Sequence, residues 1–295
     1  MGIQRIESLV FGATDLAEGA RYFDDWGLEA VERGEKGVTY RLPENQTVVV
    51  RAADDPGLPS APDGKATLRE TVWGVDTKEA LAALGAAVAT DREVTEDADG
   101  TLHARDNTGF AFALRVWDRT PAAVPAPRFN MNEFNPRLDE PVDRTRRVRP
   151  IRLGHVVFHV PMEGAYKACD FYMGRLGFRM SERADDTGTF MRCNGSQDHH
   201  NLFLAHAQNR AQFNHVAFEV RDFDEIMLGG QYMKEKGWEP ATRPGRHIMG
   251  SNMFWYFKTP FGGRTEYYAD MDRLSEDWKP PVWEKNPGYA MWMAE

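Results

Sequence analysis

The chain has 295 residues, enough for two domains of common size or one large one, and its 42% hydrophobic and 27% charged residues are typical of a globular protein. The formal net charge of -9 disfavours a nucleic-acid partner, because phosphate binding needs a basic face. The apolar runs are too short to span a membrane, the first residues lack the apolar core of a signal peptide, and two cysteines make no disulfide framework. We therefore expect a cytoplasmic protein in which histidine and carboxylate side chains hold any metal.

The first predicted elements are an apolar strand over residues 9–11 and an amphipathic helix over residues 16–26, which ends at a glycine suited to a helix C-cap. Strands separated by turn residues follow, and a similar series begins near residue 70. These elements predict a first domain over residues 1–118. The Pro-rich, charged stretch 119–150 is typical of a connection between domains.

The second half repeats this series. Its predicted strands and helices cover residues 156–160, 165–176, 211–220, 224–236, 254–258 and 264–268. They form a second domain over residues 151–272. Residues 273–295 are rich in tryptophan and proline, so we expect an irregular tail that packs over a domain surface or a neighbouring subunit.

The two halves resemble each other segment by segment. WGLEAVER, from Trp26, matches LGFRMSER, from Leu176, and ETVWGVDTKEAL, from Glu70, matches HVAFEVRDFDEI, from His215. An internal repeat of this kind indicates that one structural unit has been copied. The order of elements predicts an α+β fold with four βαβββ modules, whose curled mixed sheets form two half-barrels around a cavity.

Metal-capable residues are concentrated in the second half. At matching positions it has residues that form a set absent from the first half: His155 opposite Ser8, His215 opposite Glu70, Glu266 opposite Ala113 and His200 opposite Val49. A single histidine at the start of a strand is more often structural than a ligand, and we interpret His159 in that way. Two imidazoles and one carboxylate on strands, however, form the facial triad of non-heme Fe(II) enzymes.

Two further motifs accompany His155, His215 and Glu266. The segment GRHIMGSNMFWYFKTPFGGRTEYY, residues 245–268, contains in order Gly-Arg-His, Ser-Asn, Tyr, Pro-x-Gly and Glu, and DHHNLFL covers residues 198–204. With these motifs the chain resembles, over nearly its whole length, the type I extradiol dioxygenases of the vicinal oxygen chelate superfamily. The resemblance implies two tandem vicinal-oxygen-chelate half-barrel domains, of which the first holds no metal.

The resemblance also implies roles for residues around the metal. His200 is the expected acid–base residue, with His199 as the alternative. Tyr256 is expected to hydrogen-bond the substrate or the oxygen beside iron, and His247 to orient the substrate hydroxyl or Tyr256. The competing interpretations make Tyr256 a core aromatic and His247 a surface loop residue. The residues expected to bind substrate are His199, Asn252, Arg243, Phe190 and Met253.

By the same resemblance, Fe(II) would bind a catechol through both hydroxyls together with O2. The ring would open next to the vicinal hydroxyls by way of an alkylperoxo intermediate, in the catabolism of aromatic compounds. Apolar residues near the motifs favour an alkyl- or aryl-substituted catechol. Replacement of Fe(II) by Mn(II) and the position of cleavage stay open, and the aromatic tail favours a homo-oligomer.

Two alternatives remain open at this point. Glyoxalase-like isomerases and epimerases of the superfamily share the metal ligands alone and use Ni, Zn, Co or Mn. They do not imply the set of His200, His247 and Tyr256, which favours ring cleavage. The other alternative is a metal-free protein of the same fold that binds an aromatic ligand, and metal analysis separates it from both enzymes.

Overall fold

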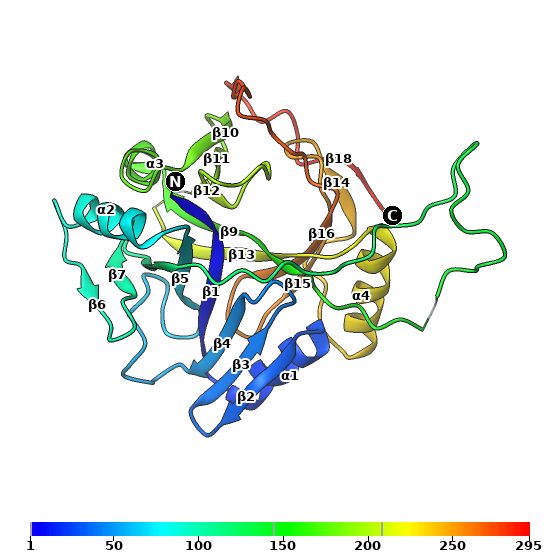
Figure 1. Cartoon of the computed structure of the whole chain (residues 1–295), viewed down its shortest axis with the longest axis horizontal. Coiled ribbons are helices and arrows are strands. Elements are labelled where there is room, and N and C mark those ends of the chain that lie inside the picture. The colour runs from blue at the N-terminus through cyan, green and yellow to red at the C-terminus, as the bar shows by residue number, and fades with distance from the viewer. Residues whose placement is uncertain (1, 144, 208) are drawn as a thin grey trace.

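Two large sheets, one in each half of the chain, form the framework of the protein (Figure 1). The computed structural model describes residues 2–143, 145–207 and 209–295. The first sheet has eight strands in the order β2-β3-β4-β1-β5-β8-β7-β6. The elements of this half are β1 (Ile3–Ala13), α1 (Leu16–Trp26), β2 (Glu29–Gly34), β3 (Gly37–Arg41), β4 (Thr47–Ala52), β5 (Leu68–Val75), α2 (Lys78–Val88), β6 (Thr95–Glu96), β7 (Leu102–Arg105) and β8 (Ala111–Val116).

The second sheet has ten strands in the order β17-β10-β11-β12-β9-β13-β16-β15-β14-β18. The elements of this half are β9 (Arg152–Pro161), α3 (Ala165–Gly174), β10 (Arg179–Ala184), β11 (Gly188–Arg192), β12 (Leu202–Ala207), β13 (Gln212–Glu219), α4 (Phe223–Glu235), β14 (Gly245–His247), β15 (Met253–Lys258), β16 (Arg264–Ala269), β17 (Val282–Trp283) and β18 (Ala290–Met293). Each half contains the βαβββ order twice, so the predicted α+β fold of four modules is confirmed.

Helix α1 begins and ends where its sequence predicts. The Asp15 carboxylate accepts a hydrogen bond from the Glu18 backbone N–H at 3.0 Å, which satisfies one of the free donors of the first turn. The helix ends at Gly27, whose φ of 98° lies in the left-handed region that favours glycine. Its buried face includes the aromatic residues Tyr22, Phe23 and Trp26.

These aromatic residues join the two halves. Trp26 stacks on Tyr267 of β16 with ring centroids 3.6 Å apart, and the Tyr267 hydroxyl donates to the Trp26 carbonyl oxygen at 2.6 Å. Phe23 stacks on Phe261 with centroids 5.3 Å apart. The first module thus packs against the fourth, and the outer face of β16 is held by the N-terminal half of the chain.

The sheet registers test the alignment of the two halves. In the second sheet, Ala217 pairs with both His155 and Glu266. In the first sheet, one residue of β5 likewise pairs with both Ser8 and Ala113. His155 therefore occupies the place of Ser8, and Glu266 that of Ala113, as the sequence predicted.

The alignment of His200 with Val49 was wrong. Val49 pairs with Val10 of β1, and the equivalent pair in the second sheet is Phe203 with Val157 of β9. The connection that leads into β12 is longer than the one that leads into β4, and this shifts the register. His200 lies in that connection, just before β12 begins.

The segment between the two sheets has no helix or strand among its described residues, from 117 to 151. Figure 1 shows that part of it runs out beyond α4 and away from both sheets. Several apolar side chains on it are exposed, among them Phe134 and Leu138. Within the described residues, no helix combines the length and apolar character needed to cross a membrane.

The C-terminal tail is more regular than expected. β17 pairs in parallel with β10, and β18 pairs antiparallel with β14. β10 and β14 would otherwise be the two edges of the second sheet. The connection from β17 to β18, residues 284–289, therefore passes from one edge of the curled sheet to the other.

Candidate metal centre

Three side chains from neighbouring strands converge inside the second sheet. His155 on β9, His215 on β13 and Glu266 on β16 are all buried, and one ligand atom from each lies within 4.8 Å of the others. Glu266 Oε2 is 3.0 Å from His155 Nε2 and 3.3 Å from His215 Nε2. The two Nε2 atoms are 3.3 Å apart. The predicted metal ligands are thus brought together.

The sheet register explains why these residues meet. Ala217 lies between His155 and Glu266 in the ladder, and strand alternation puts His215 on the same face as Ala217. The small alanine side chain leaves room for the three larger ones around it.

The hydrogen bonds around His215 show that this donor set fits a metal cation. Arg264 donates a hydrogen bond to Asn214 Oδ1, which agrees with this atom being the acceptor oxygen of the amide. The hydrogen bond of 2.8 Å between Asn214 Oδ1 and His215 Nδ1 is therefore donated by His215. The proton of a neutral His215 is therefore on Nδ1, and the lone pair on Nε2 points towards Glu266. Burial lowers the pKa of His215 to about 3, so the ring is neutral.

Glu266 is the charged member of the group. Burial alone would raise its pKa, but His155 and His215 beside it bring the pKa well below its usual value. Asn252 Nδ2 donates to its other oxygen, Oε1, at 3.0 Å. A negative oxygen and two imidazole nitrogens facing one another are a suitable set for a divalent first-row metal.

A small, mostly apolar cavity of about 140 Å³ opens above these residues. Of the predicted site residues, it is lined by His155, His215, His200, His247, Tyr256, Asn252 and Phe190. The His200 ring lies 4.1 Å from the His155 ring, between centroids. Burial, with His155 beside it, lowers the pKa of His200 well below its usual value, so this ring is neutral as well.

His247 and Tyr256 form a hydrogen-bonded pair at the other side of the cavity. His247 Nδ1 donates to the Tyr289 carbonyl oxygen at 2.9 Å, so Nε2 of the neutral ring accepts from the Tyr256 hydroxyl at 3.0 Å. Burial lowers the pKa of His247, which favours the neutral ring. Tyr256 is thereby a buried hydroxyl whose hydrogen-bond direction is set by His247.

Three residues expected to bind substrate do not line the cavity. Met253 faces α4 together with Trp255, because alternation along β15 points these two away from Tyr256. Arg243 lies near the Ala294 carbonyl. His199 lies behind His200 and contacts Glu182. The predicted substrate contacts of Met253, Arg243 and His199 are therefore wrong for this cavity.

Sequence reasoning also missed residues of the cavity wall. Phe203 stacks on Phe190 with centroids 3.9 Å apart, and strand alternation on β12 could have placed it there. Asn286, Gly288 and Tyr289 come from the C-terminal tail. No periodicity marks these three, since their place depends on how the tail crosses the sheet.

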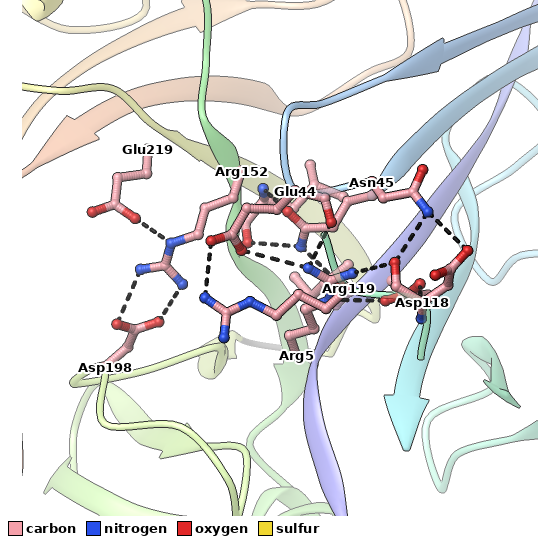
Figure 2. A network of polar contacts seen from close by, with 12 residues as sticks. Arg5, Glu44, Asn45, Asp118, Arg119, Arg152, Asp198 and Glu219 are labelled. Carbon is pink, nitrogen blue, oxygen red and sulfur yellow. Dashed lines mark hydrogen bonds and ion pairs between the residues drawn. The ribbon is translucent and has the colours of Figure 1, made fainter. Parts of the chain in front are cut away.

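The loop that carries His199 and His200 is tied to the strand of His155. Arg152, at the start of β9, binds both carboxylate oxygens of Asp198 at 2.7 and 3.0 Å, and it also binds Glu219 (Figure 2). Burial would raise the pKa of Asp198, but Arg152 lowers it. A buried bidentate pair of this kind fixes the loop beside the metal ligands.

Comparisons with known proteins show which families and folds the chain is similar to. Residues 152–267 match the family described as the Glyoxalase/Bleomycin resistance protein/Dioxygenase superfamily. Metapyrocatechase 2 of Cupriavidus necator is 37% identical over 131 residues, 44% of this chain and 40% of that protein. A manganese-dependent 2,3-dihydroxybiphenyl 1,2-dioxygenase of Geobacillus genomosp. 3 is 28% identical over 123 residues, 41% of this chain and 38% of that protein. These matches span less than half the length of either relative.

Solved structures resemble the whole chain. The Mn(II)-bound glyoxalase from Novosphingobium aromaticivorans has a TM-score of 0.77 at 24% identity, over 97% of this chain and 89% of that one. The 2,2',3-trihydroxybiphenyl 1,2-dioxygenase from Sphingomonas wittichii strain RW1 has a TM-score of 0.74 at 20% identity, and the match covers 100% of this chain and 99% of that one. Such likeness establishes the fold. The second half of the chain is thus similar to the Glyoxalase/Bleomycin resistance protein/Dioxygenase superfamily and to catechol-cleaving relatives, and the whole chain shares the fold of solved dioxygenases and glyoxalases.

Proposed function

We propose that this protein cleaves the ring of a substituted catechol with O2, next to the two hydroxyls, using Fe(II) held by His155, His215 and Glu266. The observation that carries the proposal is the convergence of two imidazole nitrogens and one carboxylate oxygen beside a small cavity. The relatives named as metapyrocatechase and as dihydroxybiphenyl dioxygenase support the same reaction class. One of them is manganese-dependent, so Mn(II) is the alternative metal.

The bound metal would supply the coordination positions at which the catechol oxygens and O2 meet. His200 is a neutral imidazole whose ring centroid lies 4.1 Å from that of His155, and it would take or return a proton of the substrate. The Tyr256 hydroxyl, held by His247, would donate a hydrogen bond to an oxygen of the substrate. His200 and Tyr256 are themselves buried, which limits the access of water to them.

The cavity favours a small apolar substrate. Stacked Phe190 and Phe203, with Met249, form one side of it, and Tyr289 closes another. Among the described residues, Arg264 is the one arginine or lysine that lines the cavity, and it is already bound to Asn214. An alkyl-substituted catechol therefore fits better than one that carries a carboxylate.

The test is oxygen uptake by anaerobically Fe(II)-loaded protein mixed with catechol and alkylcatechols. We expect stoichiometric uptake and a yellow ring-fission product. A protein that binds Fe(II) but consumes no O2 with any of these catechols would exclude the proposal.

The second candidate is a glyoxalase-like isomerase. It is favoured by the high TM-score to a Mn(II)-bound glyoxalase. Such an enzyme would show no O2 uptake, and it would act on its own substrate with Mn(II) under anaerobic conditions. The positions of His200, His247 and Tyr256 around the ligands favour ring cleavage, and the converging ligands themselves count against a metal-free binding protein.

A further inference from the structure

A line of hydrogen bonds runs from the C-terminal tail to His200. Trp283 Nε1 donates to Glu182 Oε1 at 2.6 Å, and Glu182 Oε2 is 3.1 Å from His199 Nε2. His199 Nδ1 is in turn 3.1 Å from His200 Nδ1. Glu182, His199 and His200 are all buried, while Trp283 is partly exposed at β17.

The chemistry of these groups gives each hydrogen bond a direction. A carboxylate only accepts, so the proton of a neutral His199 is on Nε2 and its Nδ1 is an acceptor. The bond between the two rings must then be donated by His200 Nδ1. This leaves a lone pair on His200 Nε2, the ring nitrogen free for a ligand in the cavity.

We propose that Glu182, whose other carboxylate oxygen accepts from Trp283, and His199 form a relay that fixes His200 in the tautomer with Nδ1 protonated and Nε2 bare. Glu182 and His199 are positioning residues, since His200 lines the cavity and they do not. The acid–base role of His200 rests on the proposed function. In that role a bare Nε2 accepts a proton from a substrate hydroxyl, whereas the opposite tautomer, with Nε2 protonated, cannot. A tail that crosses from one edge of the second sheet to the other is in this way part of the site.

The tautomers can be measured directly without any catechol. Full-length protein with ¹⁵N-labelled histidine and diamagnetic Zn(II) at the metal site is examined by long-range ¹H–¹⁵N correlation, which separates protonated from bare ring nitrogens. We expect His199 protonated at Nε2 and His200 protonated at Nδ1. A wild-type protein with His200 protonated at Nε2 would overturn the proposal, whether or not the protein cleaves catechols. If the tautomers are as expected but the protein does not cleave catechols, the proposed function is excluded and the proposed relay still holds.

A pair of double variants tests the direction of the relay. In Glu182→Gln the introduced amide has one acceptor oxygen, which accepts from the Trp283 indole. Its NH2 group then faces His199 Nε2, which must accept, so His199 and His200 both change to the opposite tautomer. We expect kcat to fall by about 10- to 100-fold with KM changed less than about threefold, because the acid–base step is affected more than binding. Adding Trp283→Phe frees the amide oxygen to accept from His199 again. The wild-type tautomers and most of kcat should then return.

Trp278 provides the matched control. It lies in the same tail, it is exposed to a similar degree, and its Nε1 donates at 2.7 Å to the carbonyl oxygen of Ser181, the neighbour of Glu182 on β10. Adding Trp278→Phe to Glu182→Gln should restore neither the tautomers nor kcat. Equal behaviour of the two double variants would contradict the relay. Trp283→Phe alone should keep the wild-type tautomers, which shows that the fold tolerates the change.

Discussion

At the scale of single residues, Glu266 contributes the only negative charge of the ligand set. Glu266→Ala removes that charge and leaves two imidazoles without a carboxylate in a buried site. We expect this variant to retain almost no iron after reconstitution and gel filtration, as measured by inductively coupled plasma mass spectrometry. His200→Phe, the control, should keep its iron and lose about 10²- to 10⁴-fold in ring cleavage. Full iron and activity in Glu266→Ala would contradict the ligand assignment.

Asn214 determines which nitrogen of His215 carries the proton and therefore which one faces Glu266 and the proposed metal position. Its Oδ1 accepts from His215 Nδ1, and its Nδ2 lies 2.7 Å from His159 Nε2. We expect Asn214→Ala to weaken metal binding by about 10- to 100-fold, measured by competition with a chelator of known affinity. His159→Phe removes only the partner on the other side of Asn214. Its metal affinity should stay within about threefold of wild type, and an equal loss in both variants would point to general disruption.

His103 gives the first half of the chain a pH-dependent stability. Its Nδ1 is 2.9 Å from Glu70 and its Nε2 is 3.1 Å from Asp97, and the hydrogen bond to Glu70 raises the pKa of His103 to about 8. Because the pKa of His103 is higher in the folded state, its protonation stabilises the fold. This stabilisation is fully present below pH 6.5 and is lost as the pH rises through 8. Allowing for the exposure of Asp97, it amounts to about 1 kcal/mol.

The measurement is urea unfolding at pH 6 and pH 9. The free energy of unfolding of the wild type should fall between the two by about 1 kcal/mol more than that of His103→Gln. The same pH dependence in both proteins would show that His103 does not contribute.

At the scale of elements, two glycines in helices should respond in opposite ways to replacement by alanine. A Cβ at Gly230 of α4 would lie 2.0 Å from the Trp255 ring, whereas a Cβ at Gly174 of α3 would meet nothing within 4 Å. Gly230→Ala should therefore destabilise the protein by about 1–3 kcal/mol through overpacking. Gly174→Ala should be neutral or stabilising by up to about 1 kcal/mol, because alanine favours the helix. Thermal unfolding of the two variants compares them, and a stable Gly230→Ala would show that α4 can shift away from β15.

The sequence predicted the elements well where the pattern is local. Strand and helix periodicity, and glycine at the end of α1, are properties of neighbouring residues. The convergence of His155, His215 and Glu266 could be predicted because the repeat fixes which strand positions face inward. Met253 was misplaced because the inward face of β15 was not assigned, although alternation from Tyr256 determines it.

Residues whose place depends on tertiary structure were beyond that kind of prediction. His199 and His200 are adjacent in sequence, and only the loop geometry decides that His200 faces the cavity. Tyr289 reaches the cavity because β17 and β18 pair with opposite edges of the same sheet. Short edge strands of this kind have no periodic signal in a tail of mixed composition.

At the scale of the whole molecule, aromatic contacts join the two halves. Trp26 of the first half stacks on Tyr267, which lies next to the ligand Glu266 on β16. The first half thus supports the metal centre from behind, although at the places of His155 and Glu266 it has Ser8 and Ala113. We expect Trp26→Ala to destabilise the whole chain by about 3–5 kcal/mol in a single cooperative transition, seen with coincident far-UV and near-UV circular dichroism. Two separate transitions would show that the halves fold independently.

The exposed apolar side chains of the segment between the two halves indicate self-association of the protein. Its exposed apolar side chains are Phe129, Met131, Phe134, Leu138 and Val142, and it runs away from the sheets in Figure 1. Leu138 is 82% and Phe134 59% exposed, and several large apolar residues left in water on one projecting segment are characteristic of an interface. Because the segment extends beyond α4, a second copy of the chain could cover it without blocking the metal centre.

We therefore expect the wild type to be a homo-oligomer, and the double variant Phe134→Asp with Leu138→Asp to be a monomer of 33.5 kDa by size-exclusion chromatography with light scattering. The matched control is Val31→Asp with Met162→Asp, which puts the same charges on exposed apolar residues of the two sheet domains and should keep the wild-type mass. Charge on an interface residue acts against association because it would have to be desolvated. A monomeric wild type, or an equal loss of mass in both variants, would contradict the assignment of this segment to the interface. Metal content should be unchanged in the monomer, because His155, His215 and Glu266 all lie in one chain.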